Sequence, residues 1–155
     1  MLGHGSPYGL LPVGQFRGAG CHIIDESMVE LLKEKPDNIY IWCHADKYIQ
    51  RHGLAGLCSA MFVSEIGEAI CYGFDDIDWD LIDESNNGFA SILGKYINEP
   101  LPTIYSKLLL EYGLLARTNL IARFNLDRLS LTLAGMNKYH QKVNVLDRSG
   151  VQACR

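Results

Sequence analysis

The chain has 155 residues, of which 48% are hydrophobic and 21% are charged, and its formal net charge is −4 at neutral pH. This is the composition of a globular domain with enough apolar residues for a core, and it excludes a disordered chain. The acidic balance offers no basic surface to nucleic acid or to an anionic membrane, so neither is an expected partner.

The first half of the chain predicts a loop, a helix and a buried strand, in that order. The start is rich in glycine and proline, which indicates a loop containing at most a short hairpin. Asp25 or Ser27 can cap a helix that continues to about Lys35. The run Ile-Tyr-Ile-Trp-Cys over 39–43 predicts a strand of a parallel sheet. Polar residues over 44–53 are expected to form a loop or helical turn beyond it, where open α/β sheets bind ligands.

The second half predicts a further alternation of helices and strands. Apolar spacing predicts a helix over 54–69, and flanking turn residues favour helices over 85–97 and 103–115. Short apolar runs predict strands over 69–74 and 119–126. Alternating strands and helices are typical of an α/β domain with a mostly parallel sheet.

The folded region is expected to span residues 1–130. From Leu131 onward the periodicity weakens, which predicts a loosely packed tail over 131–155. At the other end, only three residues precede His4, too few for a full strand. We therefore expect the sheet to lack its first strands. The strand edge that this exposes is expected to promote self-association, as a homodimer.

The cysteine usage indicates a reducing, cytoplasmic setting. The five cysteines are an odd number without paired spacing, and no secretory signal opens the chain. The longest apolar stretch, over 53–74, is interrupted by polar residues. No transmembrane helix is therefore expected.

A histidine and a cysteine are the sharpest candidates for chemistry. His4 lies in the glycine-rich opening, and Cys43 lies where the apolar run meets polar residues, a position typical of reactive thiols. Because the thiolate is the reactive form, we expect the imidazole to lower the pKa of the Cys43 thiol. Gly5 has no Cβ, so its N–H can approach a reacting carbonyl closely. The alternative is a hydrogen-bonded surface histidine and an inert buried thiol.

Two strings that carry these residues, "LGHGSPYGLL" and "IYIWCHAD", resemble the clan CD cysteine peptidases, the group of caspases, metacaspases, legumain, gingipains and separase. The resemblance covers about residues 1–75. It implies a three-layer caspase-like domain in which His4 is the catalytic base and acid and Cys43 is the nucleophile. It also implies that the backbone amides of Gly5 and Cys43 form the oxyanion hole, and that a peptide bond is cleaved through a thioester.

Other polar residues are candidates for a substrate pocket. His44 and Asp46 lie one and three residues after the cysteine, and Asp76 and Asp78 lie in an acidic stretch over 75–84 that could receive a basic substrate. This stretch lacks the glycine and the glutamate of an EF-hand calcium loop. The histidines lack the paired spacing of a structural zinc site. No metal and no cofactor are therefore expected.

Three classes of function remain open from the sequence. The first is a cysteine peptidase-like hydrolase that acts on a peptide or protein substrate. The second is a catalytically inactive caspase-like interaction module, and the third is an α/β domain that binds a small molecule. Selective reactivity of Cys43 would separate the first class from the others, and ligand-dependent thermal stability would reveal the third.

Overall fold

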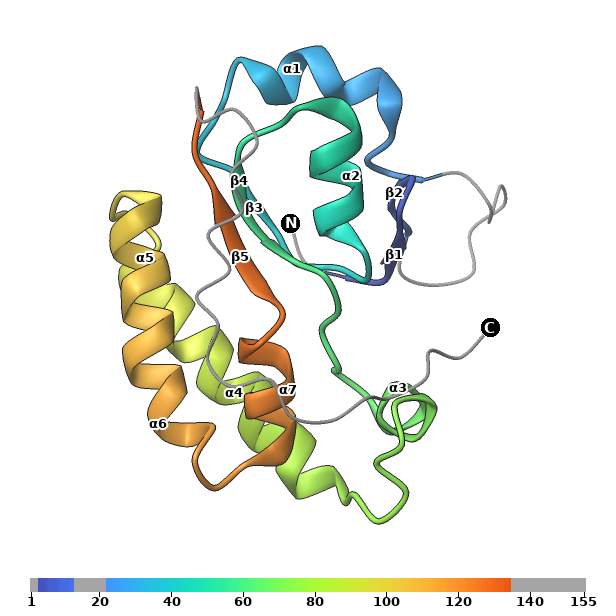
Figure 1. Cartoon of the computed structure of the whole chain (residues 1–155), viewed down its shortest axis with the longest axis vertical. Coiled ribbons are helices and arrows are strands. Elements are labelled where there is room, and N and C mark those ends of the chain that lie inside the picture. Colours follow the sequence, from blue (N-terminus) through green and yellow to red (C-terminus); the bar gives the residue numbers. More distant parts are fainter. Residues whose placement is uncertain (1–2, 13–21, 135–155) are drawn as a thin grey trace.

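The computed structural model describes residues 3–12 and 22–134, and Figure 1 shows the arrangement of their helices and strands. Helices pack on both faces of a small sheet, so the chain is a mixed α/β protein. The first elements are β1 (Gly5–Ser6), β2 (Gly9–Leu10), the 3-10 turn η1 (Glu26–Met28), α1 (Val29–Lys33), β3 (Ile39–Tyr40), α2 (Ala45–His52) and β4 (Gly56–Ser59). The later elements are α3 (Ile66–Cys71), α4 (Trp79–Tyr96), α5 (Leu101–Lys107), the π-helical turn η2 (Leu108–Tyr112), α6 (Gly113–Leu115), α7 (Leu120–Leu126) and β5 (Leu129–Thr132).

The larger sheet has the strand order β3-β4-β5 and is mixed, which corrects the expectation of a mostly parallel sheet. β3 and β4 are parallel, with Ile39 opposite Leu57, and α2 connects them. β5 runs antiparallel to β4, with Leu131 opposite Leu57. The tail was expected to begin at Leu131, but Leu131 and Thr132 belong to β5. Residues 135–155 of that expected tail lie outside the described residues.

The first half of the chain follows the sequence-based predictions. β1 and β2 form a short antiparallel hairpin. Asp25 caps η1, which leads directly into α1, because its carboxylate accepts a hydrogen bond from the Ser27 N–H at 2.9 Å. The run 39–43 begins with β3, and the polar segment 44–53 contains α2. The predicted helix, strand and helical turn are confirmed.

Three predictions for the later segments are wrong. The range 54–69 contains β4, a loop and the start of α3 rather than one helix, because β4 is buried on both faces and lacks the alternation of a half-exposed strand. The range 69–74 is the end of α3 and a turn, not a strand. The range 119–126 is α7, which Asn119 caps by accepting a hydrogen bond from the Ala122 N–H at 2.9 Å.

The predicted helices over 85–97 and 103–115 are confirmed. α4 begins earlier than predicted, at Trp79, because the Asp78 carboxylate accepts a hydrogen bond from the Leu81 N–H at 3.1 Å. The second range is helical throughout and comprises most of α5, η2 and α6. In the described part of the chain, each helix is either too short or too polar to cross a bilayer.

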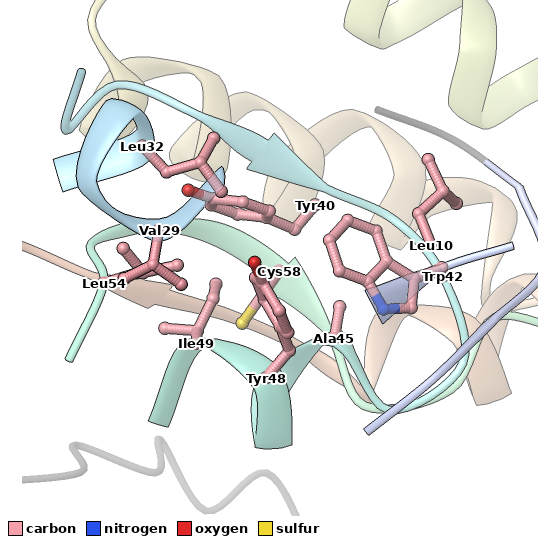
Figure 2. Packing of buried hydrophobic residues seen from close by; sticks show 10 residues of the cluster. All are labelled: Leu10, Val29, Leu32, Tyr40, Trp42, Ala45, Tyr48, Ile49, Leu54 and Cys58. Carbon is pink, nitrogen blue, oxygen red and sulfur yellow. The ribbon is translucent and has the colours of Figure 1, made fainter. Parts of the chain in front are cut away.

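The residues of β3 and of the turn after it alternate between the two faces of the sheet. Tyr40 and Trp42 pack with Cys58 against α1 and α2, and Figure 2 shows this cluster. On the opposite face, Ile41 and Leu57 pack against α4, α5, η2 and α7. Burying side chains of this size stabilises the fold by about 1.5–3 kcal/mol each. The end of β3 is therefore held firmly from both sides.

The Trp42 ring also holds the N-terminal hairpin. It makes edge-type contacts with the rings of Tyr40 and Tyr48, at centroid distances of 5.5 and 5.7 Å. Its indole N–H donates to the Ser6 carbonyl at 3.3 Å. A Cβ added to Gly5 would lie 2.1 Å from the Trp42 Cδ1, so only glycine permits this close approach.

A buried asparagine fixes the loop between β4 and α3. Asn125 of α7 is fully buried, and its side-chain oxygen accepts a hydrogen bond from the Val63 N–H at 2.7 Å. Its amide group donates to the Val63 carbonyl at 3.0 Å. One side chain thus satisfies both backbone groups of a fully buried residue. This contact sets the place at which α3 begins.

We predict that Asn125→Ala lowers the free energy of unfolding by about 2–4 kcal/mol, because it leaves the N–H and the carbonyl of Val63 buried without partners. Urea denaturation followed by circular dichroism measures the loss. Asn87→Ala, at an exposed position of α4, is the control and should change the free energy by less than about 0.5 kcal/mol. Equal stability of the two variants would contradict this role of Asn125.

Candidate functional site

The structure brings His4 and Cys43 together beside the start of α3. The backbone N–H of Gly3 donates to the Ile41 carbonyl at 3.1 Å, so the chain just before His4 runs beside the end of β3. The Cys43 thiol donates to the Glu68 Oε1 at 3.5 Å. The His4 Nδ1 lies 3.5 Å from that same oxygen. A carboxylate, rather than a direct hydrogen bond, therefore connects the imidazole and the thiol.

A second carboxylate occupies the other side of the imidazole. The His4 Nε2 lies 2.9 Å from the Glu65 Oε1. The side chains of His4 and Glu65 are about half exposed, at 49% and 48%, whereas that of Glu68 is only 16% exposed. Both ring nitrogens thus face carboxylate oxygens, and an imidazolium ring can donate to both of them.

The start of α3 holds Glu68 in place. Its second oxygen, Oε2, accepts hydrogen bonds from the Ser64 N–H at 2.8 Å and the Ser64 hydroxyl at 3.1 Å. Ser64 follows Val63, whose backbone is bound by Asn125. The carboxylate of Glu68 is therefore oriented by a chain of contacts that begins in the core at α7.

The turn that carries Cys43 has a strained backbone. His44 has φ 66° and ψ 27°, and it is the one non-glycine residue with positive φ in the described part of the chain. Its N–H donates to the Ala60 carbonyl at 2.7 Å, and the Ser59 hydroxyl donates to the Trp42 carbonyl at 3.0 Å. A conformation of this kind costs about 1–3 kcal/mol and is typical of functional sites. It turns the chain sharply from β3 into α2 immediately after Cys43.

The environment of Cys43 keeps its thiol protonated. Burial and the negative charge of Glu68 raise the pKa of the Cys43 thiol to about 11, although backbone hydrogen bonds from Phe62 and Gly5 oppose the shift. The expectation that His4 lowers this pKa is therefore wrong for this arrangement. The physical reason is that the group next to the sulfur is a carboxylate, while the imidazole faces two carboxylates.

The residues expected to form a substrate pocket do not gather in one place. His44 and Asp46 lie at the start of α2, where burial lowers the pKa of His44. Asp78 instead caps α4, and Asp76 is exposed in the turn before it. Among the described contacts, none joins either of these two aspartates to the thiol. The acidic stretch begins a helix, as carboxylates near a helix N-terminus commonly do.

Sequence reasoning missed Glu65 and Glu68. They interrupt an apolar stretch that was expected to be one helix, and Ser64-Glu65 in fact marks the point where α3 begins. A polar pair inside an apolar run is a signal for such a boundary. Their approach to His4 has no sequence signal, because it depends on contacts between distant segments.

Comparisons with protein-family models, with curated proteins and with solved structures find no match to this chain. The likeness to clan CD peptidases therefore rests on the two strings around His4 and Cys43.

We predict that Glu68→Gln lowers the pKa of the Cys43 thiol, because it removes the negative charge beside the sulfur. Below the pKa, each unit of decrease raises the thiolate fraction roughly tenfold. Alkylation of Cys43 by iodoacetamide near neutral pH, followed by mass spectrometry of its peptide, should therefore become several-fold faster or more. Glu34→Gln removes an exposed charge elsewhere and is the control. Equal rates in Glu68→Gln and the parent chain would show that Glu68 does not govern the thiol.

Proposed function

We propose that this chain is a cysteine-dependent hydrolase of the caspase-like, clan CD type, with Cys43 as nucleophile and His4 as general base and acid. One observation carries the proposal: the imidazole and the thiol, from residues far apart in the sequence, contact the same oxygen of Glu68 at 3.5 Å each. The two groups therefore lie no more than twice that distance apart. Nucleophiles and bases of unliganded enzymes are often separated in this way and close up with substrate.

The proposed reaction begins when His4 accepts the proton of the Cys43 thiol. The thiolate attacks the carbonyl carbon of a peptide bond, and the backbone amides of Gly5 and Cys43 stabilise the oxyanion that forms. The imidazolium then gives its proton to the leaving amine as the C–N bond breaks, which leaves a thioester on the sulfur. Water, deprotonated by His4, hydrolyses the thioester and restores the thiol.

Glu68 has a defined part in this proposal. While its carboxylate lies between the two groups, the thiol stays protonated and the Nδ1 of His4 is occupied. Substrate must therefore displace the carboxylate before the imidazole can reach the sulfur. The strained backbone of His44 supports a functional role for this turn, because such strain persists only where the surrounding structure holds it.

A second candidate function is a catalytically inactive caspase-like interaction module. The raised pKa of the Cys43 thiol favours it, because a protonated thiol is a poor nucleophile. The third class, a small-molecule binding domain, stays a prediction, and a thermal stability that depends on added ligand would support it.

We propose that the chain works in a reducing, cytoplasmic setting, in which a thiol nucleophile persists.

We predict that the parent chain cleaves peptides in a casein digest and that Cys43→Ser abolishes the cleavage. His4→Ala should slow it by about 100-fold or more, which is a typical contribution of a general acid and base. Cys71→Ser, which changes an exposed cysteine outside the proposed machinery, is the matched control and should retain activity. Mass spectrometry of the digest identifies the products.

Two results of this experiment would reject the hydrolase. Cleavage that survives in Cys43→Ser would assign the activity to another group. A folded parent chain that cleaves no peptide and forms no adduct with a peptidyl electrophile at Cys43 would favour the inactive module.

We also propose that the chain forms a homodimer, because strands at the edges of a small open sheet can pair with a strand of a second copy. Static light scattering at increasing concentration should show the mass of a dimer. A monomer mass throughout the concentration range would contradict the proposed homodimer.

A further inference from the structure

We infer that His4, Glu65 and Glu68 bind a divalent transition metal ion, of which Zn²⁺ suits the donor set best. One ring nitrogen of His4 and one oxygen of each carboxylate lie within 4.8 Å of one another. Ligand atoms around a tetrahedral zinc ion with bonds of about 2.0–2.2 Å lie roughly 3.3–3.6 Å apart. In this structure the two ring nitrogens face different carboxylates, with Nε2 2.9 Å from the Glu65 Oε1 and Nδ1 3.5 Å from the Glu68 Oε1. An ion therefore requires one ring nitrogen to turn toward both carboxylates, which the half-exposed histidine side chain permits.

The donor types favour zinc over the hard cations. An imidazole nitrogen with two carboxylate oxygens suits zinc and its neighbours in the first transition series, whereas calcium and magnesium prefer oxygen ligands alone. Three protein ligands are also the number found in zinc sites that keep a position for water or substrate. The half-exposed side chains of His4 and Glu65 leave an open path for the ion.

The ligands are supported by neighbouring groups, as ligands in built metal sites are. Glu65 directly precedes α3, and Glu68 lies in its first turn. The Ser64 N–H and hydroxyl bind the Oε2 of Glu68 and leave its Oε1 to face the histidine. Such contacts to a ligand's second atom fix its orientation and strengthen metal binding.

The sulfur of Cys43, from the turn after β3, lies 3.5 Å from the Oε1 of Glu68. It contacts one of the three ligands and is not itself among the atoms that lie within 4.8 Å of one another. The site thus joins the N-terminal segment and the start of α3, next to the thiol.

Metal binding would regulate the proposed hydrolase. An ion held by His4 and Glu68 would keep the imidazole away from the Cys43 proton, so zinc should inhibit peptide cleavage and a chelator should restore it. This consequence rests on the proposed function, whereas binding itself does not.

Isothermal titration of the full chain with zinc chloride tests the site. We expect the parent chain to bind Zn²⁺, and Glu65→Gln and His4→Ala each to weaken that binding by at least about tenfold. Glu34→Gln carries the same loss of charge at an exposed position of another segment and should bind as the parent does. Circular dichroism verifies that each variant is folded, and Glu65→Gln is a mild change at a half-exposed side chain.

Absence of zinc binding by the parent, or equal affinity in the parent and in the His4 and Glu65 variants, would overturn the inference. Binding that depends on these residues in a chain that cleaves no peptide would support the metal site and reject the hydrolase. Cleavage of peptide by a chain that binds no zinc would reject the metal site and support the hydrolase.

Discussion

The carboxylate of Glu68 is the contact on which the arrangement of the candidate site depends. One of its oxygens meets both the thiol of Cys43 and the imidazole of His4, and the other is bound by Ser64. A largely covered negative charge needs such partners, because it would otherwise be costly to remove from water. The same charge disfavours a thiolate beside it. The contact that brings the two groups together thus also keeps the thiol in its unreactive form.

The position of this carboxylate follows from the core. Asn125 binds both backbone groups of Val63, and α3 begins two residues after Ser64. On the other side, Trp42 is fixed between Tyr40 and Tyr48 and holds the hairpin next to His4. Packing on both faces of the sheet therefore determines where the polar groups of the site meet. The residues of the site lie in loops and at the first turn of a helix, and contacts from the core hold these segments in place.

Part of this site could be predicted from the sequence. The junction of an apolar run with polar residues indicated Cys43, which lies in the turn after β3, and the short hairpin beside His4 was indicated by glycine and proline. The carboxylates could not be predicted, because their segment has the apolar spacing of a helix while β4 is buried on both faces. Asp78 looked like a pocket residue, yet its carboxylate caps α4. Local patterns predict local structure, whereas the meeting of His4 and Glu68 depends on contacts between distant segments.

A double-mutant cycle of His4→Ala and Glu68→Gln, read by the alkylation rate of Cys43, tests the central claim most directly. Because the carboxylate lies between the two groups, removing His4 should change the rate little while Glu68 is present. In the Glu68→Gln background, the same removal should slow alkylation by about tenfold, a coupling of about 1.4 kcal/mol. Additive effects of the two substitutions would show that the imidazole and the thiol are not connected through Glu68, and would contradict the account.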